Sequence, residues 1–172
     1  MHIRPTPYDH PDAVALEQAV QREYMVRYDS DGDATPLDPK MFVPPHGLYL
    51  LVYDAEGRPV ASGGWRTQDE NEYGYADGDA ELKRMYVAPE ARGLGLARRV
   101  LAALEEDARA AGRTRMVLET GTAQPEAIAL YASSGYEPCR EKFGHYRHYE
   151  SSRCFAKPLV QGPIRHPLPD RP

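Results

Sequence analysis

The chain has 172 residues, of which 41% are hydrophobic and 27% charged, so it is long enough and apolar enough to bury one sizeable globular core. A net charge of −5 argues against nucleic acid or an anionic membrane as the main partner. No apolar run approaches the roughly 20 residues of a membrane span, no signal core opens the chain, and Cys139 and Cys154 form no disulfide framework, so we expect a cytoplasmic protein.

The first part of the chain predicts a strand, a helix and a hairpin. Residues 2–6 are typical of a short strand, and apolar residues at helical spacing predict a helix over residues 13–25. Residues 47–53 and 59–66 predict two strands joined by a turn. Gly63 and Gly64 lie inside the second of these strands, which indicates a bulge or a close approach of another group.

An Asp- and Gly-rich segment, residues 29–33, resembles the first half of a calcium-binding loop. Ala34 stands where that motif requires glycine, and Lys40 stands where it requires the closing glutamate. We therefore expect a solvated loop here, followed by a helix-poor connection that several prolines interrupt.

Residues 81–97 are the most informative stretch of the sequence. Their first half is typical of a buried strand that Pro89 ends, and a loop with two glycines follows at residues 92–95. Apolar residues at helical spacing then predict a helix over residues 96–111, closed by Gly112. A glycine-containing loop that leads into a helix N-terminus predicts an anion site, because the first N–H groups of a helix have no intrahelical partner.

The pattern of this loop distinguishes between anion-binding motifs. The dinucleotide fingerprint requires a third glycine where the chain has Arg98, and the Gly-Lys-Ser/Thr ending of a nucleotide P-loop is absent. The remaining pattern, Arg92-x-x-Gly95-x-Ala97, resembles the pyrophosphate-binding signature of the GNAT superfamily of acetyl-CoA-dependent N-acetyltransferases. An ordinary strand–turn–helix corner is the alternative interpretation of these six residues.

A second segment carries the same resemblance. Residues 115–119 predict a strand and residues 126–134 a helix that contains Ala127-x-x-x-Tyr131, after which Gly-Tyr opens the next strand. This is similar to the other half of the GNAT core, except that Gln124 stands where the family usually has an asparagine that binds the cofactor. The resemblance extends over about residues 47 to 158.

The order of elements predicts an α+β protein with a mixed, mostly antiparallel sheet, forming one domain over residues 1–160. The last two strands are expected at residues 136–139 and 153–159, and residues 161–172 are expected to be a loose, Pro-rich tail. The resemblance implies more: an α/β/α-like GNAT fold whose two central strands splay apart between flanking helices, leaving a V-shaped cleft.

Amide formation requires a free amine, and a primary amine is mostly protonated at pH 7, so a base that accepts its proton raises the rate. The resemblance implies that Glu81 is this base. Glu119 in the neighbouring strand is the alternative, as is a chain of water molecules. The resemblance also implies that Tyr131 is the general acid that protonates the departing sulfur, although a buried structural tyrosine remains an alternative.

The resemblance also assigns the binding of acetyl-CoA, the expected co-substrate. Backbone amides of one strand would bind the pantetheine arm, a glycine loop would wrap the pyrophosphate, and an amide side chain would add a hydrogen bond. These roles fall on Met85, Tyr86 and Val87, on Arg92, Gly93, Leu94, Gly95, Leu96 and Ala97, and on Gln124.

No metal is expected. Cys139, His145, His148 and Cys154 form a candidate ligand set, but their spacings are not those of structural zinc sites. The His-rich segment is instead expected to line the acceptor pocket or the surface.

The sequence gives conflicting signals about the acceptor. An acidic run at residues 69–81 would attract a cationic amine, although it is equally well explained as a solubilising loop. Arg27, which the resemblance places near the acceptor, would instead suit a carboxylate. We therefore expect a small primary amine and leave open an amino-acid-like zwitterion.

The predicted function is transfer of the acetyl group of acetyl-CoA to a primary amine of a small molecule, by direct attack in a ternary complex. The alternatives are a protein or peptide N-acetyltransferase and a catalytically silent acyl-CoA sensor. No nucleic acid or membrane partner is expected, and the protein is expected to be a monomer or a homodimer.

Overall fold

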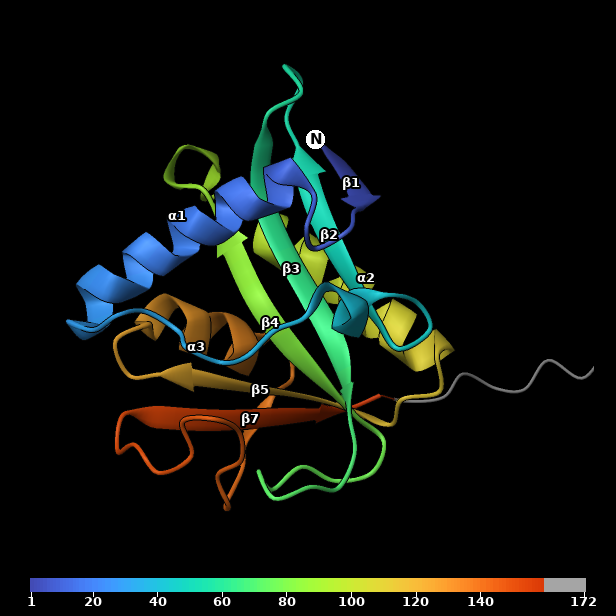
Figure 1. Ribbon diagram of the computed structural model, residues 1–172, viewed down its shortest axis with the longest axis vertical. Helices are drawn as coiled ribbons and strands as arrows, with labels where there is room; N and C mark the ends of the chain where they lie inside the picture. The colour runs from blue at the N-terminus through green and yellow to red at the C-terminus, as the bar shows by residue number, and fades with distance from the viewer. Residues whose placement is uncertain (160–172) are drawn as a thin grey trace, which may run out of the picture.

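The computed structural model describes residues 1–159, and a seven-stranded sheet runs through them (Figure 1). The strand order is β1-β2-β3-β4-β5-β7-β6, and every neighbouring pair is antiparallel except β4–β5, as the predicted mixed sheet requires. The expected Pro-rich tail, residues 161–172, lies outside the described residues. The strands are β1 His2–Pro5, β2 Gly47–Tyr53, β3 Pro59–Gln68, β4 Asp79–Val87, β5 Arg115–Gly121, β6 Glu137–Pro138 and β7 Ser152–Pro158.

Helices cover both faces of this sheet, with α1 in front of it and α2 behind it in Figure 1. They are α1 Pro11–Tyr28, α2 Leu96–Ala110 and α3 Pro125–Ser133, with short 3₁₀ turns at η1 Pro39–Phe42 and η2 Pro89–Ala91. The Nδ1 atom of His10 accepts a hydrogen bond from the Asp12 N–H, which caps the start of α1. None of the helices within residues 1–159 combines the length and apolar content that crossing a bilayer requires.

The alternation of side chains along β2 explains why both faces are covered. Leu50 and Val52 point into the core beneath α2, whereas Tyr49 and Leu51 point into a second apolar cluster beneath α1 and η1. Successive side chains of a strand point to opposite faces, so a strand that is apolar at every position needs a partner on each side. The sheet is therefore the middle layer of three.

Strands β4 and β5 separate after a short paired stretch. Only Asp79–Glu81 of β4 pair with β5, opposite Arg115–Val117, although both strands continue beyond these residues. The edge of β4 that follows Glu81 therefore has no strand partner on the β5 side within residues 1–159. This divergence confirms the predicted splay of the two central strands (Figure 1).

A β-bulge interrupts the pairing of β3 with β4 close to the point where β4 and β5 diverge. Ser62 pairs with Tyr86 and Gly64 with Lys83, so two residues of β4 lie opposite Gly63 alone. A Cβ atom on Gly63 would lie 2.4 Å from the Met85 sulfur, which explains the glycine. This confirms the predicted bulge and close approach in β3.

Candidate active site

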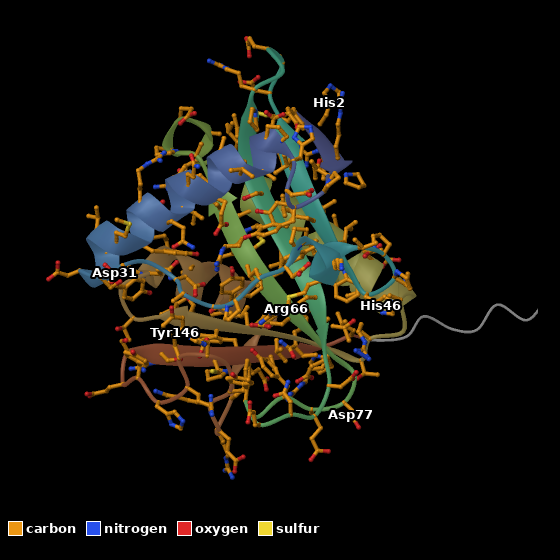
Figure 2. All side chains as sticks on the ribbon, viewed as in Figure 1. His2, Asp31, His46, Arg66, Asp77 and Tyr146 are labelled. Atoms are coloured by element: carbon orange, nitrogen blue, oxygen red, sulfur yellow. The ribbon has the colours of Figure 1, made fainter. Side chains whose placement is uncertain are left out.

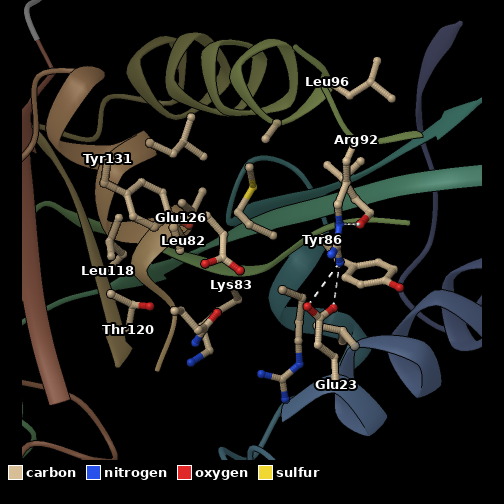
Figure 3. Close-up of a pocket in the computed structure, with 18 of the residues that line it drawn as sticks. Glu23, Leu82, Lys83, Tyr86, Arg92, Leu96, Leu118, Thr120, Glu126 and Tyr131 are labelled. Atoms are coloured by element: carbon tan, nitrogen blue, oxygen red, sulfur yellow. Dashed lines mark hydrogen bonds and ion pairs between the residues drawn. The ribbon is translucent and has the colours of Figure 1, made fainter. Parts of the chain in front are cut away.

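A cavity of about 390 Å³ opens between the diverging strands (Figure 3). We call it the first cavity. Its walls come from the second half of β4, from Leu118 to Thr120 on β5, from α1, from the loop before α2 and from α3. The volume and the mixture of apolar and polar walls are those of a small-molecule site.

The N-terminus of α2 forms one end of the first cavity and is suited to an anion. Gly93 and Gly95 have φ angles of 81° and 73°, which favour glycine, and a Cβ on either would meet no atom within 4 Å. Among residues 1–159 no side chain caps this helix, so its first N–H groups can bind a ligand. Gly93, Gly95, Leu96 and Ala97 line the cavity, whereas the Leu94 side chain is exposed and does not.

Arg92 adds a positive charge at the same end. Its Nε atom donates to the Val87 carbonyl at 2.9 Å, and its Nη2 atom donates to Glu23 Oε2 at 2.9 Å (Figure 3). Glu23 also accepts from Arg27 at 2.8 Å, and Arg27 pairs in turn with Glu126 at the start of α3. A chain of balanced ion pairs thus runs along the first cavity from the loop before α2 through α1 to α3.

A second cavity, of about 370 Å³, adjoins the first. It lies between the C-terminal part of α1, the strap formed by residues 29–38, and the segment between β6 and β7, which is marked by Tyr146 in Figure 2. The residues that line both cavities are Tyr24, Asp33, Lys83, Glu119, Thr120 and Gln124. The two cavities therefore meet between β4 and β5.

Glu119 lies at this junction. Its carboxylate accepts hydrogen bonds from the Tyr146 N–H at 3.1 Å and from the Ser152 hydroxyl at 3.2 Å. Burial raises the pKa of Glu119 to about 7, because the hydrogen bonds and Lys83 only partly offset the loss of hydration. A carboxylate with this pKa accepts and releases a proton near neutral pH.

Glu81 occupies a different environment. It is 1% exposed and lines neither cavity. Arg66 Nε lies 2.8 Å from its Oε2 atom and Lys83 Nζ lies 3.4 Å from Oε1. Burial acts to raise the pKa of Glu81, but Lys83 and Arg66 together outweigh burial and lower it. Glu81 therefore lies outside both cavities with its charge paired, and its role as base stays a prediction.

Tyr131 lies on the wall of the first cavity, where α3 faces β5 (Figure 3). Its side chain is 6% exposed, and burial raises the pKa of its phenol, which keeps the hydroxyl protonated at neutral pH. Within residues 1–159, no hydrogen bond joins this hydroxyl to another protein group, so it remains available to a ligand.

The other predicted ligand-binding residues gather around the first cavity. Met85, Tyr86 and Val87 line it from the free edge of β4, and Gln124 lines both cavities from the N-cap position of α3. The Gln124 amide donates to the Tyr28 hydroxyl at 2.9 Å, which fixes its orientation between the cavities.

The acidic run and Arg27, both expected near the acceptor, lie outside the second cavity. None of the acidic residues at 69–79 lines either cavity; Asp69 pairs with Arg113, and Asp79 pairs with Arg115 at 2.7 Å. Figure 2 shows Asp77 at the opposite end of the sheet from Asp31, well below Tyr146. Arg27 lines only the first cavity. Within the described residues, no group of three or more His, Cys, Asp or Glu is arranged to bind a metal ion.

The expectation of a solvated loop at residues 29–33 was wrong for Asp33. This side chain is 17% exposed and pairs with Arg84 and, at 3.9 Å, with Lys83 on β4. Burial opposes its ionisation, but these two cations hold the pKa of Asp33 well below its usual range. Ala34 then donates its N–H to the Tyr146 hydroxyl at 2.6 Å, so the strap closes the outer wall of the second cavity.

Lys83 and Asp33 line the cavities but were not predicted from the sequence, whereas Tyr146 belongs to the His-rich segment that was expected to line the acceptor pocket or the surface. Lys83 follows Glu81 by two positions on one strand, a spacing that places both side chains on one face and that would have indicated the pair. Nothing in the local sequence indicates the contacts of Asp33 and Tyr146, because their partners lie 51 and 112 residues away.

Comparisons with known proteins agree with this geometry. The sequence model of the Acetyltransferase (GNAT) family matches residues 13–136. An IAA acetyltransferase of Azospirillum brasilense is 40% identical over 112 residues, which cover 65% of this chain and 69% of that protein. An uncharacterized N-acetyltransferase of Escherichia coli K12, YjgM, is 33% identical over 141 residues, which cover 78% of this chain and 80% of that protein.

A solved structure shows the same fold. A crystal structure from Klebsiella pneumoniae, assigned as an acyl-CoA N-acyltransferase, superposes with a TM-score of 0.72 at 30% identity, covering 92% of this chain and 97% of that one. The chain therefore belongs to the acetyltransferase (GNAT) family. It is an acyltransferase of the N-acetyltransferase type, as the sequence resemblance implied.

Proposed function

We propose that the protein transfers the acetyl group of acetyl-CoA to the primary amine of a small molecule, by direct attack in a ternary complex. The observation that carries this proposal is the meeting of two cavities at Glu119 in the cleft between β4 and β5. One cavity ends at an anion site and the other is closed by the strap, so two different ligands can approach one point from opposite sides.

The first cavity suits acetyl-CoA. The glycine loop and the uncapped N-terminus of α2 offer N–H donors to the pyrophosphate, and Arg92 adds charge. The free edge of β4 at Met85, Tyr86 and Val87 offers backbone groups to the amides of the pantetheine arm. Gln124 can add a hydrogen bond from its amide at the opposite wall.

We assign the base to Glu119 and the general acid to Tyr131. Glu119 takes one proton from the ammonium group of the acceptor, directly or through water, and the freed amine attacks the thioester carbonyl. As the C–N bond forms and the C–S bond breaks, Tyr131 on the cavity wall donates a proton or a hydrogen bond to the departing sulfur, and the second proton lost by the nitrogen restores the phenol or passes to solvent. Lys83 holds Asp33 and Glu81 and acts as a positioning residue.

The closed outer wall favours a small molecule over a protein acceptor. The Ala34–Tyr146 hydrogen bond and the Asp33 ion pairs tie the strap down over the second cavity. A peptide would need an open groove at this position. The two free cysteines, Cys139 and Cys154, suit a reducing compartment, so we propose a cytoplasmic location.

Release of thiol from acetyl-CoA across a panel of amines, amino acids, aminoglycosides and short peptides tests this proposal. We expect turnover of at least one small amine and no turnover of peptides. Turnover of peptides alone would establish the protein N-acetyltransferase instead. Tight binding of acetyl-CoA without thiol release on any acceptor would establish the silent sensor.

A further inference from the structure

The second cavity is lined by aromatic faces. Tyr24 and Tyr28 from α1 and Tyr146 and Tyr149 from the segment before β7 all line it, and His145 lies against Tyr146 with ring centroids 4.9 Å apart. The Tyr28 hydroxyl is held by Gln124 and the Tyr146 hydroxyl by the Ala34 N–H. These two tyrosines therefore have their polar ends occupied and leave their rings for a ligand.

The charges beneath the cavity form one buried network on β3, β4, β5, α1 and the strap. Arg66 and Lys83 flank Glu81, and Arg84 Nε lies 2.7 Å from Glu17 Oε1 and pairs with Asp33. Ion pairs join the cations Arg66, Lys83 and Arg84 to the carboxylates Glu17, Asp33 and Glu81, and Glu119 lines both cavities beside Lys83 without an ion pair of its own. When Glu119 is ionised, these seven side chains carry four negative and three positive charges, so one negative charge is left unbalanced.

We propose that the acceptor is a monoamine carried on an aromatic or other flat apolar body and lacking a carboxylate. This inference rests on the proposed function and names its substrate class. One ammonium group beside Glu119 completes the charge balance of the network, and the tyrosine rings receive the body of the molecule.

The charges around the second cavity also argue against amino acids and polyamines as acceptors. Lys83 is the only lysine or arginine among the described residues that line the second cavity, and it already lies 3.4 Å from Glu81 and 3.9 Å from Asp33. The carboxylate of an amino acid would therefore be buried without a cationic partner of its own, which is costly. A polyamine would need further carboxylates, but Asp33 is already paired with Arg84 and Lys83.

Four acceptors test the proposal through thiol release. The reference is 2-phenylethylamine; L-phenylalanine adds a carboxylate, ethylamine lacks the ring, and spermidine lacks the ring and adds further amines, so it is compared with ethylamine. We expect kcat/KM for 2-phenylethylamine to exceed that of each other acceptor by about 100-fold, the scale on which a site rejects unpaired buried groups. Equal or better use of L-phenylalanine or spermidine would overturn the charge argument, and equal use of ethylamine would overturn the aromatic one.

Calorimetric binding to the CoA-saturated enzyme separates this inference from the proposed function. We expect 2-phenylethylamine to bind more tightly than L-phenylalanine, and Glu119→Gln to weaken its binding about tenfold while leaving the neutral isostere 2-phenylethanol unchanged. Glu105→Gln, a substitution outside both cavities, is the matched control and should change neither. Discrimination in binding without thiol release would refute acetyl transfer but uphold the ligand class. Thiol release without discrimination would refute only the ligand class.

Discussion

Replacement of Glu119 by glutamine separates its chemical role from its structural one. A glutamine side-chain oxygen can still accept from the Tyr146 N–H or the Ser152 hydroxyl, so the fold should be retained. Loss of a general base typically costs about 10²-fold to 10⁴-fold in rate, so we expect kcat/KM to fall at least 100-fold at pH 8, or about 2.7 kcal/mol in activation free energy.

The pH dependence of kcat/KM should also differ between wild type and Glu119→Gln, in a direction that the pKa of Glu119 sets. The base is active when ionised, so with a pKa of about 7 the wild-type kcat/KM should rise with pH through neutrality, and Glu119→Gln should remove this limb. The free energy of unfolding should change with pH in the opposite direction to kcat/KM. A carboxyl pKa raised in the folded state contributes stability that is present below its unfolded pKa and lost as pH rises toward 7. The variant should therefore be more stable than wild type at pH 8, by about 1–3 kcal/mol.

Initial rates between pH 5.5 and 9 and thermal unfolding at pH 5 and pH 8 measure both effects. Glu105→Gln serves as the control, since it removes a carboxylate that pairs with Lys157 outside both cavities. A Glu119→Gln enzyme that keeps kcat/KM within threefold of wild type, with the same limb near pH 7, would refute the assignment of the base.

Three further substitutions test the rest of the site, and a fourth, Gly57→Ala, is the control for one of them. Tyr131→Phe should lower kcat about 10-fold to 100-fold with little change in stability or acetyl-CoA affinity, because its hydroxyl has no protein partner within residues 1–159; equal losses in turnover and affinity would mean a packing role. Arg92→Ala should raise the Kd of acetyl-CoA about tenfold, as expected for loss of a charge-assisted hydrogen bond, and an unchanged Kd would contradict the pyrophosphate site. Gly95→Ala and Gly57→Ala both force alanine to a positive φ and should each cost about 1 kcal/mol of stability, but only Gly95→Ala should weaken acetyl-CoA binding; equal affinities would show that the loop does not contact the ligand.

The helices and strands were predictable because each is a local pattern. The helical spacing of the residues after Gly95 and the uninterrupted apolar run of β2 both predicted elements within a few residues of their observed bounds. The bulge opposite Gly63 was also indicated, because a glycine inside a strand weakens it and so usually marks a bulge or a close contact.

The choice between Glu81 and Glu119 was not predictable in this way. Both are carboxylates within neighbouring strands of the sheet, and only the Lys83 that follows Glu81 by two positions marks a local difference between them. Their pKa values shift in opposite directions because Arg66 and Lys83 pair with Glu81, whereas Glu119 is buried with mostly neutral donors. Lys83 lies on the same strand as Glu81, but Arg66, Tyr146 and Ser152 come from other parts of the chain, and only the tertiary structure brings them into contact with the two carboxylates.

The central claim is that two ligands meet at Glu119 and that the acetyl group passes directly between them. Initial rates of thiol release, measured while both acetyl-CoA and an accepted amine are varied, test this claim most directly. We expect double-reciprocal lines that intersect, an acetylated amine as product, and no acetylated protein when amine is omitted. Parallel lines together with acetylated protein isolated in the absence of amine would contradict it.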